Sequence, residues 1–373
     1  MNNRQRLLAV LHYQEYDRMP LVHFGFWRET IQKWNQEGHI SDEDAAGVYD
    51  NSPNEQKLTA RLGFDFNYAG SLGNSTSLHP SFEPKLLEIQ ADGFHRSLNE
   101  DGAIVLTKPG VVSIPAEVGH TLVDRASWEE HYKWRLQYSD DRVSWDKLAQ
   151  LKAINDTRDF PRGINLGSLF GRIRDIMGVI GVSYLLEDDE ELYDEIINTF
   201  ADMQYTVAEK ALAYGAQFDF AHYWEDICYN HGPLVNPSVF REKVGPHYKR
   251  MTDLCKRYGI DIVSLDCDGQ IDALLPIWFE NGVNTMFPIE VGTWDANIRP
   301  WREKYGKELR GVGGMDKKVF AFDYAAVDAE IERLKPLVAL GGYIPCPDHR
   351  IAPDAKWENV QYYTERMREE FWK

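Results

Sequence analysis

The residues after Pro161 alternate between short apolar runs and longer segments, and this rhythm constrains the fold more than any other feature. Short apolar runs bounded by turn residues are typical of buried parallel strands, and the segments between them have helical periodicity. Neighbouring parallel strands need a crossover connection, usually a right-handed one through a helix. The pattern therefore predicts a parallel α/β fold with strands at 163–166, 218–222, 262–265, 284–288, 309–312 and 342–345.

The number of these units favours a closed barrel over an open sheet. About eight strand–helix units in a chain of this length indicate a (β/α)8 TIM barrel. No Gly-x-Gly-x-x-Gly follows the first expected strand, at 21–24, and no P-loop is present, which weakens a nucleotide-binding alternative. Before Pro161 we expect an N-terminal helical elaboration and a small antiparallel β insertion at 82–114, all within one domain of residues 1–373.

Composition narrows the classes of protein further. A net charge of −18 argues against nucleic-acid binding, which needs a positive surface. No apolar run approaches the ~20 residues of a membrane span, and the N-terminus has no signal-peptide core, so a cytoplasmic protein is expected. The cysteines form no CxxC pair, so a disulfide framework is not expected.

Polar side chains follow the expected strands where each one ends. In a TIM barrel these C-terminal ends build the active site. The residues in these positions are carboxylates, a histidine and thiols: Glu225, Asp226, Asp266, Cys267, Asp268, Glu290, Asp316, Cys346, Asp348 and His349. Single members of this set can instead be helix caps or solvated ion pairs, Glu225 and Asp316 among them.

Asp266 and Asp268 form the most informative pair. Two carboxylates at one strand end raise each other's pKa unless a cation or metal compensates their charge. Asp, Cys and His are all zinc ligands, and a catalytic zinc keeps one position open for substrate or water. The spacing permits such a site, with Cys267 as an alternative ligand. An aromatic set could line the substrate pocket beside them, although single members are more often core residues: Trp27, Tyr68, His222, Tyr223 and Trp224.

Several segments resemble the uroporphyrinogen decarboxylase superfamily. Its opening is similar to 4–11 followed by Asp17-Arg18-Met19-Pro20, and its final strand and helix are similar to 341–360. Trp224-Glu225-Asp226 and Asp266-Cys267-Asp268-Gly269 fit a divergent branch. The resemblance covers nearly the whole chain and implies a TIM barrel. The arginine-rich and Phe-Ser-Asp segments of the decarboxylases are missing, since 23–28 and 66–70 differ from both.

The other branch of the superfamily consists of corrinoid-linked methyltransferases, and the resemblance favours this branch. It implies a zinc held by Asp266, Asp268 and His349, with Glu225, Asp226 and Cys267 as catalytic groups or a further ligand. Substrate contacts would come from the aromatic set with Glu290 and Asp316. The implied reaction moves a methyl group from a small methoxylated or methylated compound to a corrinoid protein, and a homodimer is an option. The alternatives are a metal-free, decarboxylase-like lyase and a degenerate, non-catalytic barrel.

Overall fold

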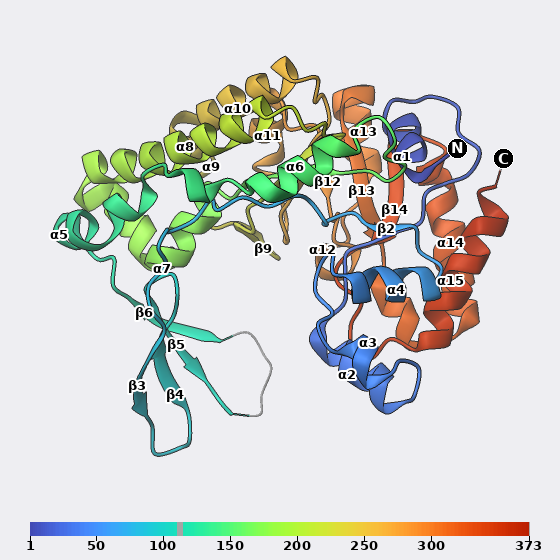
Figure 1. Ribbon diagram of the computed structural model, residues 1–373, viewed down its shortest axis with the longest axis horizontal. Coiled ribbons are helices and arrows are strands. Elements are labelled where there is room, and N and C mark those ends of the chain that lie inside the picture. The colour runs from blue at the N-terminus through green and yellow to red at the C-terminus, as the bar shows by residue number, and fades with distance from the viewer. Residues whose placement is uncertain (110–114, 373) are drawn as a thin grey trace.

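The computed structural model describes residues 1–109 and 115–372, and a parallel barrel is its central element (Figure 1). Two strands, β1 (Val22–His23) and β2 (Phe66–Asn67), pair in parallel with each other. A second parallel sheet contains six strands in the order β14 (Tyr343–Pro347), β13 (Arg310–Met315), β12 (Thr285–Phe287), β11 (Val263–Asp266), β8 (Phe220–Trp224) and β7 (Gly163–Gly167).

Backbone hydrogen bonds just beyond the strand ends join the two sheets. Leu72, which follows β2, donates to the carbonyl of Gly163 at 2.8 Å and accepts from Asn165 at 2.9 Å. At the other seam, Ile351 donates to the carbonyl of Gly25 at 3.0 Å and β1 lies beside β14. The eight strands therefore form the predicted TIM barrel.

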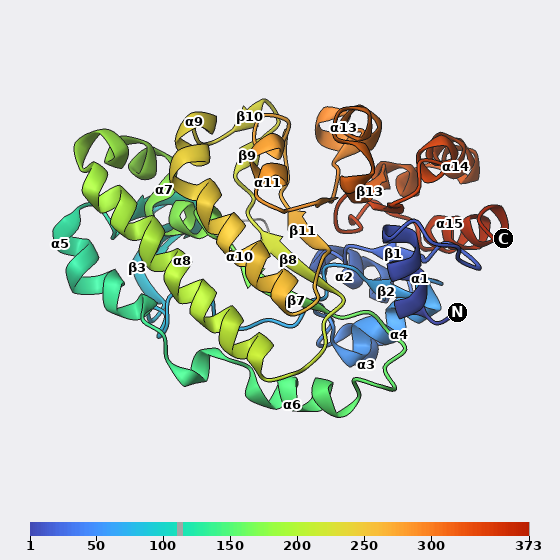
Figure 2. The same ribbon diagram turned by 90° about the horizontal axis from the view of Figure 1, so that it is seen from above.

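Helices surround the barrel on its outside, as the view from above shows (Figure 2). Their apolar faces are buried against the strands in one continuous core. The helix at 170–188 has a kink at Gly178, where φ is +72°. The principal helices of this layer are α7 (Phe170–Asp188), α8 (Glu190–Ala213), α10 (Gly245–Arg257), α11 (Leu275–Glu280), α13 (Ile298–Tyr305), α14 (Tyr324–Val338) and α15 (Trp357–Glu370).

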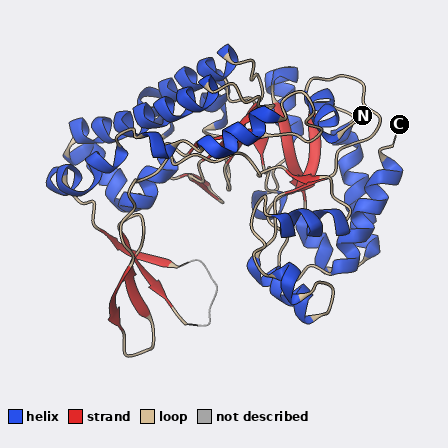
Figure 3. Ribbon diagram, in the orientation of Figure 1, coloured by secondary structure: helices blue, strands red, loops and turns tan. Residues whose placement is uncertain are grey.

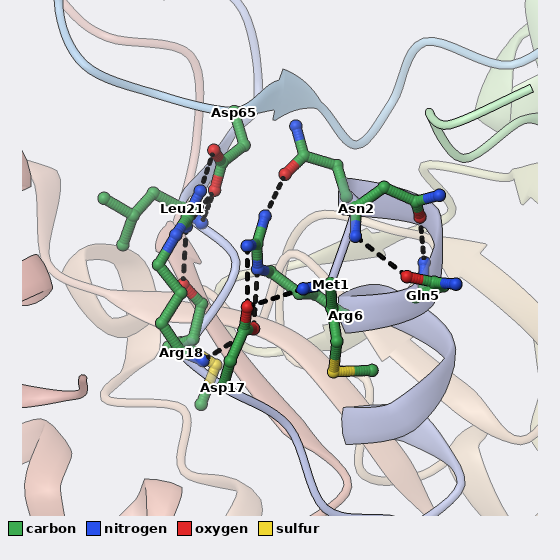
Figure 4. A network of polar contacts seen from close by, with 10 residues as sticks. Met1, Asn2, Gln5, Arg6, Asp17, Arg18, Leu21 and Asp65 are labelled. Carbon is green, nitrogen blue, oxygen red and sulfur yellow. Dashed lines mark hydrogen bonds and ion pairs between the residues drawn. The ribbon is translucent and has the colours of Figure 1, made fainter. Parts of the chain in front are cut away.

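The N-terminal elaboration contains α1 (Asn3–Leu11), α2 (Arg28–Gln36), α3 (Asp42–Ala45) and α4 (Pro53–Arg61), as predicted. A polar network fixes its first part to the barrel (Figure 4). Both Nη atoms of Arg18 donate to Asp65 at 2.6 Å, and the same carboxylate accepts from the backbone of Leu21 at 2.8 Å. These bonds place β1 and β2 side by side.

The antiparallel insertion is present and larger than predicted (Figure 3). It is a four-stranded sheet of β3 (Lys85–Ile89), β4 (His95–Leu98), β5 (Ala103–Thr107) and β6 (Ala116–His120). The predicted boundary at 114 falls short of β6, and residues 110–114 of that prediction lie outside the described residues. The short helices α5 (Arg125–Ser127) and α6 (Trp145–Ala153) lead back to β7.

Among the helices that the structure describes, none is long and apolar enough to cross a membrane.

Gly313 in β13 has a conformation that other residues tolerate poorly. Its φ is +136°, and a Cβ atom there would lie 1.6 Å from the carbonyl oxygen of Pro288. That carbonyl accepts a hydrogen bond from Gly314 at 2.9 Å, so the two backbones cannot separate without losing it. The close approach fixes β13 against the end of β12.

We therefore expect Gly313→Ala to lower the free energy of unfolding by more than about 3 kcal/mol, or to prevent folding, through overpacking and strain. Urea denaturation followed by circular dichroism measures this. Gly259→Ala is the matched control, because Gly259 also has positive φ but no atom within 4 Å of its Cβ position. Its expected cost is about 1–2 kcal/mol. Equal costs for both variants would contradict the argument.

Candidate active site at the barrel mouth

The C-terminal ends of the strands meet at one mouth of the barrel. In Figure 1 this mouth faces downward, toward the side where the β3–β6 sheet and the helices α2–α4 extend. Register explains which residues meet: Asp266 lies opposite Trp224 on one side and Phe287 on the other. Met315 lies opposite Pro347, so the residues after β13 and β14 are also neighbours. The mouth therefore brings together the polar positions expected from the sequence.

Four carboxylates form an acidic cluster there: Asp226, Asp266, Asp268 and Glu290. Burial raises the pKa of Asp266 well above its ordinary value, and Asp268 and Asp226 raise it further. Burial and then Asp268 also raise the pKa of both Asp226 and Glu290. The carboxylates thus destabilise each other's charge, which marks a site that needs a cation or protons.

His349 contacts this cluster directly. Its Nε2 lies 3.2 Å from Oδ2 of Asp268, while its Nδ1 accepts a hydrogen bond from the backbone of Arg350 at 2.8 Å. Trp27 stacks on the imidazole with ring centroids 5.4 Å apart and 13° between the planes. The ring of His349 is therefore fixed in position from three sides.

The three predicted metal ligands are close together but do not surround one point. Asp268 and His349 face each other, whereas Oδ2 of Asp266 lies 4.0 Å from Nε2 of His222. Burial lowers the pKa of His222 to about 4, so this neighbour is neutral at pH 7 and does not balance the charge of Asp266. Within residues 1–109 and 115–372, no three His, Cys, Asp or Glu side chains are arranged as a metal site. Oδ1 of Asp268 is buried and has no hydrogen-bond partner.

Glu225 points away from this cluster. Its carboxylate is buried and accepts backbone hydrogen bonds from Leu169, Phe170 and Gly171 at 2.8–3.0 Å, at the N-terminus of α7. The hydroxyl groups of Ser168 and Tyr248 also donate to it. A carboxylate saturated in this way stabilises the helix terminus and connects α7 to α10. The predicted catalytic residue thus has a structural position.

Cys267 directly follows β11, between two members of the acidic cluster. Its thiol is buried and donates to the carbonyl of Asp268 at 3.5 Å. Burial and the neighbouring Cys228 raise its pKa well above the ordinary value, which disfavours a thiolate nucleophile.

The predicted substrate-binding residues divide into two groups. Tyr68 and His222 are buried inside the barrel beneath the cluster, in an aromatic floor with Phe220 and Phe287. Tyr223 faces the outer helices and packs on Tyr248.

The remaining four lie at the rim, and one of them, Trp27, is the ring stacked on His349. Trp224 is half-buried beside Arg172, and Glu290 accepts from the backbone of Gly269 at 2.6 Å. Asp316 caps the short helix 317–321 by accepting from the backbone of Lys318. Trp27, Trp224 and Glu290 remain candidates for substrate contact, while Tyr223 and Asp316 have structural positions.

Two basic residues of the mouth, Lys317 and Arg350, were not predicted as site residues, and Asp348 was expected at a strand end without an assigned role. Asp348 accepts from the backbones of Gly292 at 2.8 Å and Lys317 at 3.2 Å. Arg350 donates to Asp50 at 2.9 Å, in the loop before α4. The sequence feature that could have identified these residues is their position directly after strands β13 and β14.

The matching family model spans residues 176–370 and is described as uroporphyrinogen decarboxylase. The chain belongs to the uroporphyrinogen decarboxylase family. A solved methyltransferase from Methanosarcina mazei is similar in fold, with a TM-score of 0.61, 15% identity and full coverage of both chains. A B12-independent methionine synthase from Shewanella sp. W3-18-1 has a TM-score of 0.45 and 13% identity, covering 95% of this chain and 98% of its own. No curated protein matches the sequence.

Glu55, behind the Arg350–Asp50 pair, supplies a pH-dependent test of this part of the structure. Burial raises the pKa of its carboxyl to about 7. Between the ordinary value near 4.5 and 7, the folded state binds more protons than the unfolded state, so stability falls as pH rises. We expect unfolding to become easier by about 3 kcal/mol across this window.

Chemical denaturation of wild type and Glu55→Gln at pH 4.5 to 8 measures this effect. The amide does not titrate, so the variant is expected to lose the decline in stability between pH 4.5 and 7. Identical pH profiles for the two proteins would contradict the assignment of the effect to Glu55.

Proposed function

We propose that this protein is a zinc-dependent methyltransferase that moves a methyl group from a small methoxylated or methylated substrate to a corrinoid protein. The observation that carries the proposal is the acidic cluster with His349 at the barrel mouth. Family membership and the fold shared with a protein named methyltransferase are consistent with it. A partner corrinoid protein, a homodimer and a cytoplasmic location belong to the same proposal.

The donor set fits a divalent metal in two respects. Burial and mutual repulsion disfavour the charged forms of Asp226, Asp266 and Glu290, although Arg174 lies 3.6 Å from Asp226 and offsets part of this. Oδ1 of Asp268 is a buried oxygen without a hydrogen-bond partner. Asp266, Asp268 and His349 would hold the metal after a rearrangement of their side chains. A zinc with oxygen and nitrogen ligands supplies a Lewis acid suited to polarising an ether or hydroxyl oxygen.

The chain's own residues would bind and orient the substrate. The aromatic floor around Tyr68 and His222 closes the barrel below the cluster and excludes water from it. Trp27 and the backbone of Arg350 fix the imidazole of His349. Burial raises the pKa of Asp226 and Glu290, which makes both carboxylates stronger proton acceptors than exposed ones.

A second candidate function is a metal-free lyase in which the cluster handles protons. The hydrogen bond from Arg350 makes Nδ1 of His349 an acceptor, so the neutral ring carries its proton on Nε2, toward Asp268. A metal bound at Nε2 would require the other tautomer. This geometry favours an acid–base pair, and metal analysis separates the two candidates.

The test is the metal content of protein purified without chelators, together with methyl transfer to a cob(I)alamin acceptor. We expect about one zinc per chain and its loss in Asp268→Ala and His349→Ala. Methyl transfer should fall by at least about 100-fold in both variants, as is usual when a catalytic group is removed. Asp295→Asn, an exposed carboxylate after α12 (Val291–Trp294), is the control and should retain metal and activity.

Two other experimental outcomes would support the two alternative functions, a lyase and a non-catalytic barrel. Metal-free folded protein that turns over a carboxylated substrate supports the lyase. Folded protein without activity, made more stable by Asp266→Ala, supports a non-catalytic barrel, because that change removes the carboxylate repulsion at no cost.

A further inference from the structure

Lys317 is a half-buried cation at the mouth, and no group of residues 1–109 or 115–372 forms an ion pair with its ammonium. It follows β13, and its backbone donates to Asp348, the residue before His349. Its pKa is lowered by burial, while Asp348, Glu290 and Asp268 act on it in the opposite direction. The side chain thus lies within reach of the field of the acidic cluster.

Three of the four acids that act on Lys317 are engaged elsewhere, and the fourth, the exposed Asp354, forms no hydrogen bond or ion pair with it. Asp348 accepts from two backbone groups, Glu290 from Gly269 and Thr293, and Asp268 faces His349. Across the described residues, the Lys317 ammonium has no hydrogen bond or ion pair with any side chain or carbonyl. A half-buried ammonium without such partners is costly unless a ligand supplies them.

Three other basic side chains around the mouth are occupied, whereas the exposed Arg28 has no hydrogen bond or ion pair within the described residues. Arg350 pairs with Asp50, and Arg174 bonds Asp175 and the carbonyl of Asp226. The adjacent Lys318 donates to the carbonyl of Gly292 at 2.7 Å. Lys317 and Lys318 both follow β13, but within the described residues only the Lys318 ammonium has a hydrogen-bond partner.

We propose that the Lys317 ammonium binds a carboxylate group of the substrate, which makes the substrate a small monoanionic molecule. The reacting group of the substrate, a methoxy or methyl group, is taken from the proposed function. The binding of a carboxylate by Lys317 does not depend on that function. One ammonium matches one carboxylate, and the neighbouring acids repel a second negative charge. Trp27, stacked on His349, provides a flat surface for the uncharged part of the substrate.

Calorimetric titration of the full chain with 4-methoxybenzoate, methoxyacetate and the neutral 4-methoxybenzyl alcohol tests the proposal. The wild type should bind at least one acid more tightly than the alcohol. Lys317→Met should weaken acid binding about 10- to 100-fold, the range expected for a lost charge-assisted hydrogen bond, and leave alcohol binding unchanged. Lys318→Met, the matched control, should behave as the wild type, and Lys317→Arg should retain part of the affinity.

Equal binding of acid by wild type and Lys317→Met overturns the proposal, as does a wild type that binds neither acid. Loss of acid binding in Arg28→Met but not in Lys317→Met also overturns the proposal. Arg28 is exposed and follows Trp27, so it would then be the group that binds the carboxylate. Zinc content, measured on the same samples, separates this proposal from the function above. Acid selectivity without zinc leaves the Lys317 assignment in place and removes the metal-dependent reaction.

Discussion

Closure of the barrel is the constraint on which the candidate site depends. Asp268 follows the fifth barrel strand and His349 follows the eighth, yet their side chains meet at 3.2 Å. They can do so only because the seams at Leu72 and Ile351 bring the first and last strands together. An open sheet with the same strands would place these residues at distant points along its edge. The chemistry of the mouth is therefore a property of the closed topology.

The closed mouth also creates an electrostatic problem. Four carboxylates share a low-dielectric space, and the neutral His222 does not offset their charge. A fifth carboxylate, Glu225, does not join the cluster, because it accepts hydrogen bonds from the N-terminus of α7 and from the hydroxyl of Tyr248 in α10. What remains at the mouth is charge that a ligand, metal or proton must balance. Lys317 lies near these carboxylates, so such a ligand would be close to both a positive and several negative groups.

Much of this arrangement could be predicted from the sequence. The apolar runs before Asp266 and Asp348 located the strand ends, and the shared edge of parallel strands then predicted that 266, 268 and 349 would lie close together. The sequence could not predict β2, because a two-residue strand at 66–67 leaves no periodic signal and exists through its pairing with β1. It also could not distinguish Asp316 from Lys317. The short helix 317–321 begins directly after β13 and uses the Asp316 carboxylate as its cap, whereas the charge of Lys317 interacts with Asp348, Glu290 and Asp268.

The stacking of Trp27 on His349 has a stereochemical consequence. One face of the imidazole is covered by the indole, and both ring nitrogens have neighbours, Asp268 and the backbone of Arg350. Phe24 also packs against the ring, with centroids 5.5 Å apart, so a substrate would approach along the Asp268 edge or over the part of the opposite face that Phe24 leaves open. A proton or other group exchanged there would reach a prochiral centre from a single side. The tryptophan at the start of α2 would thereby set the handedness of the product without touching the reacting bond.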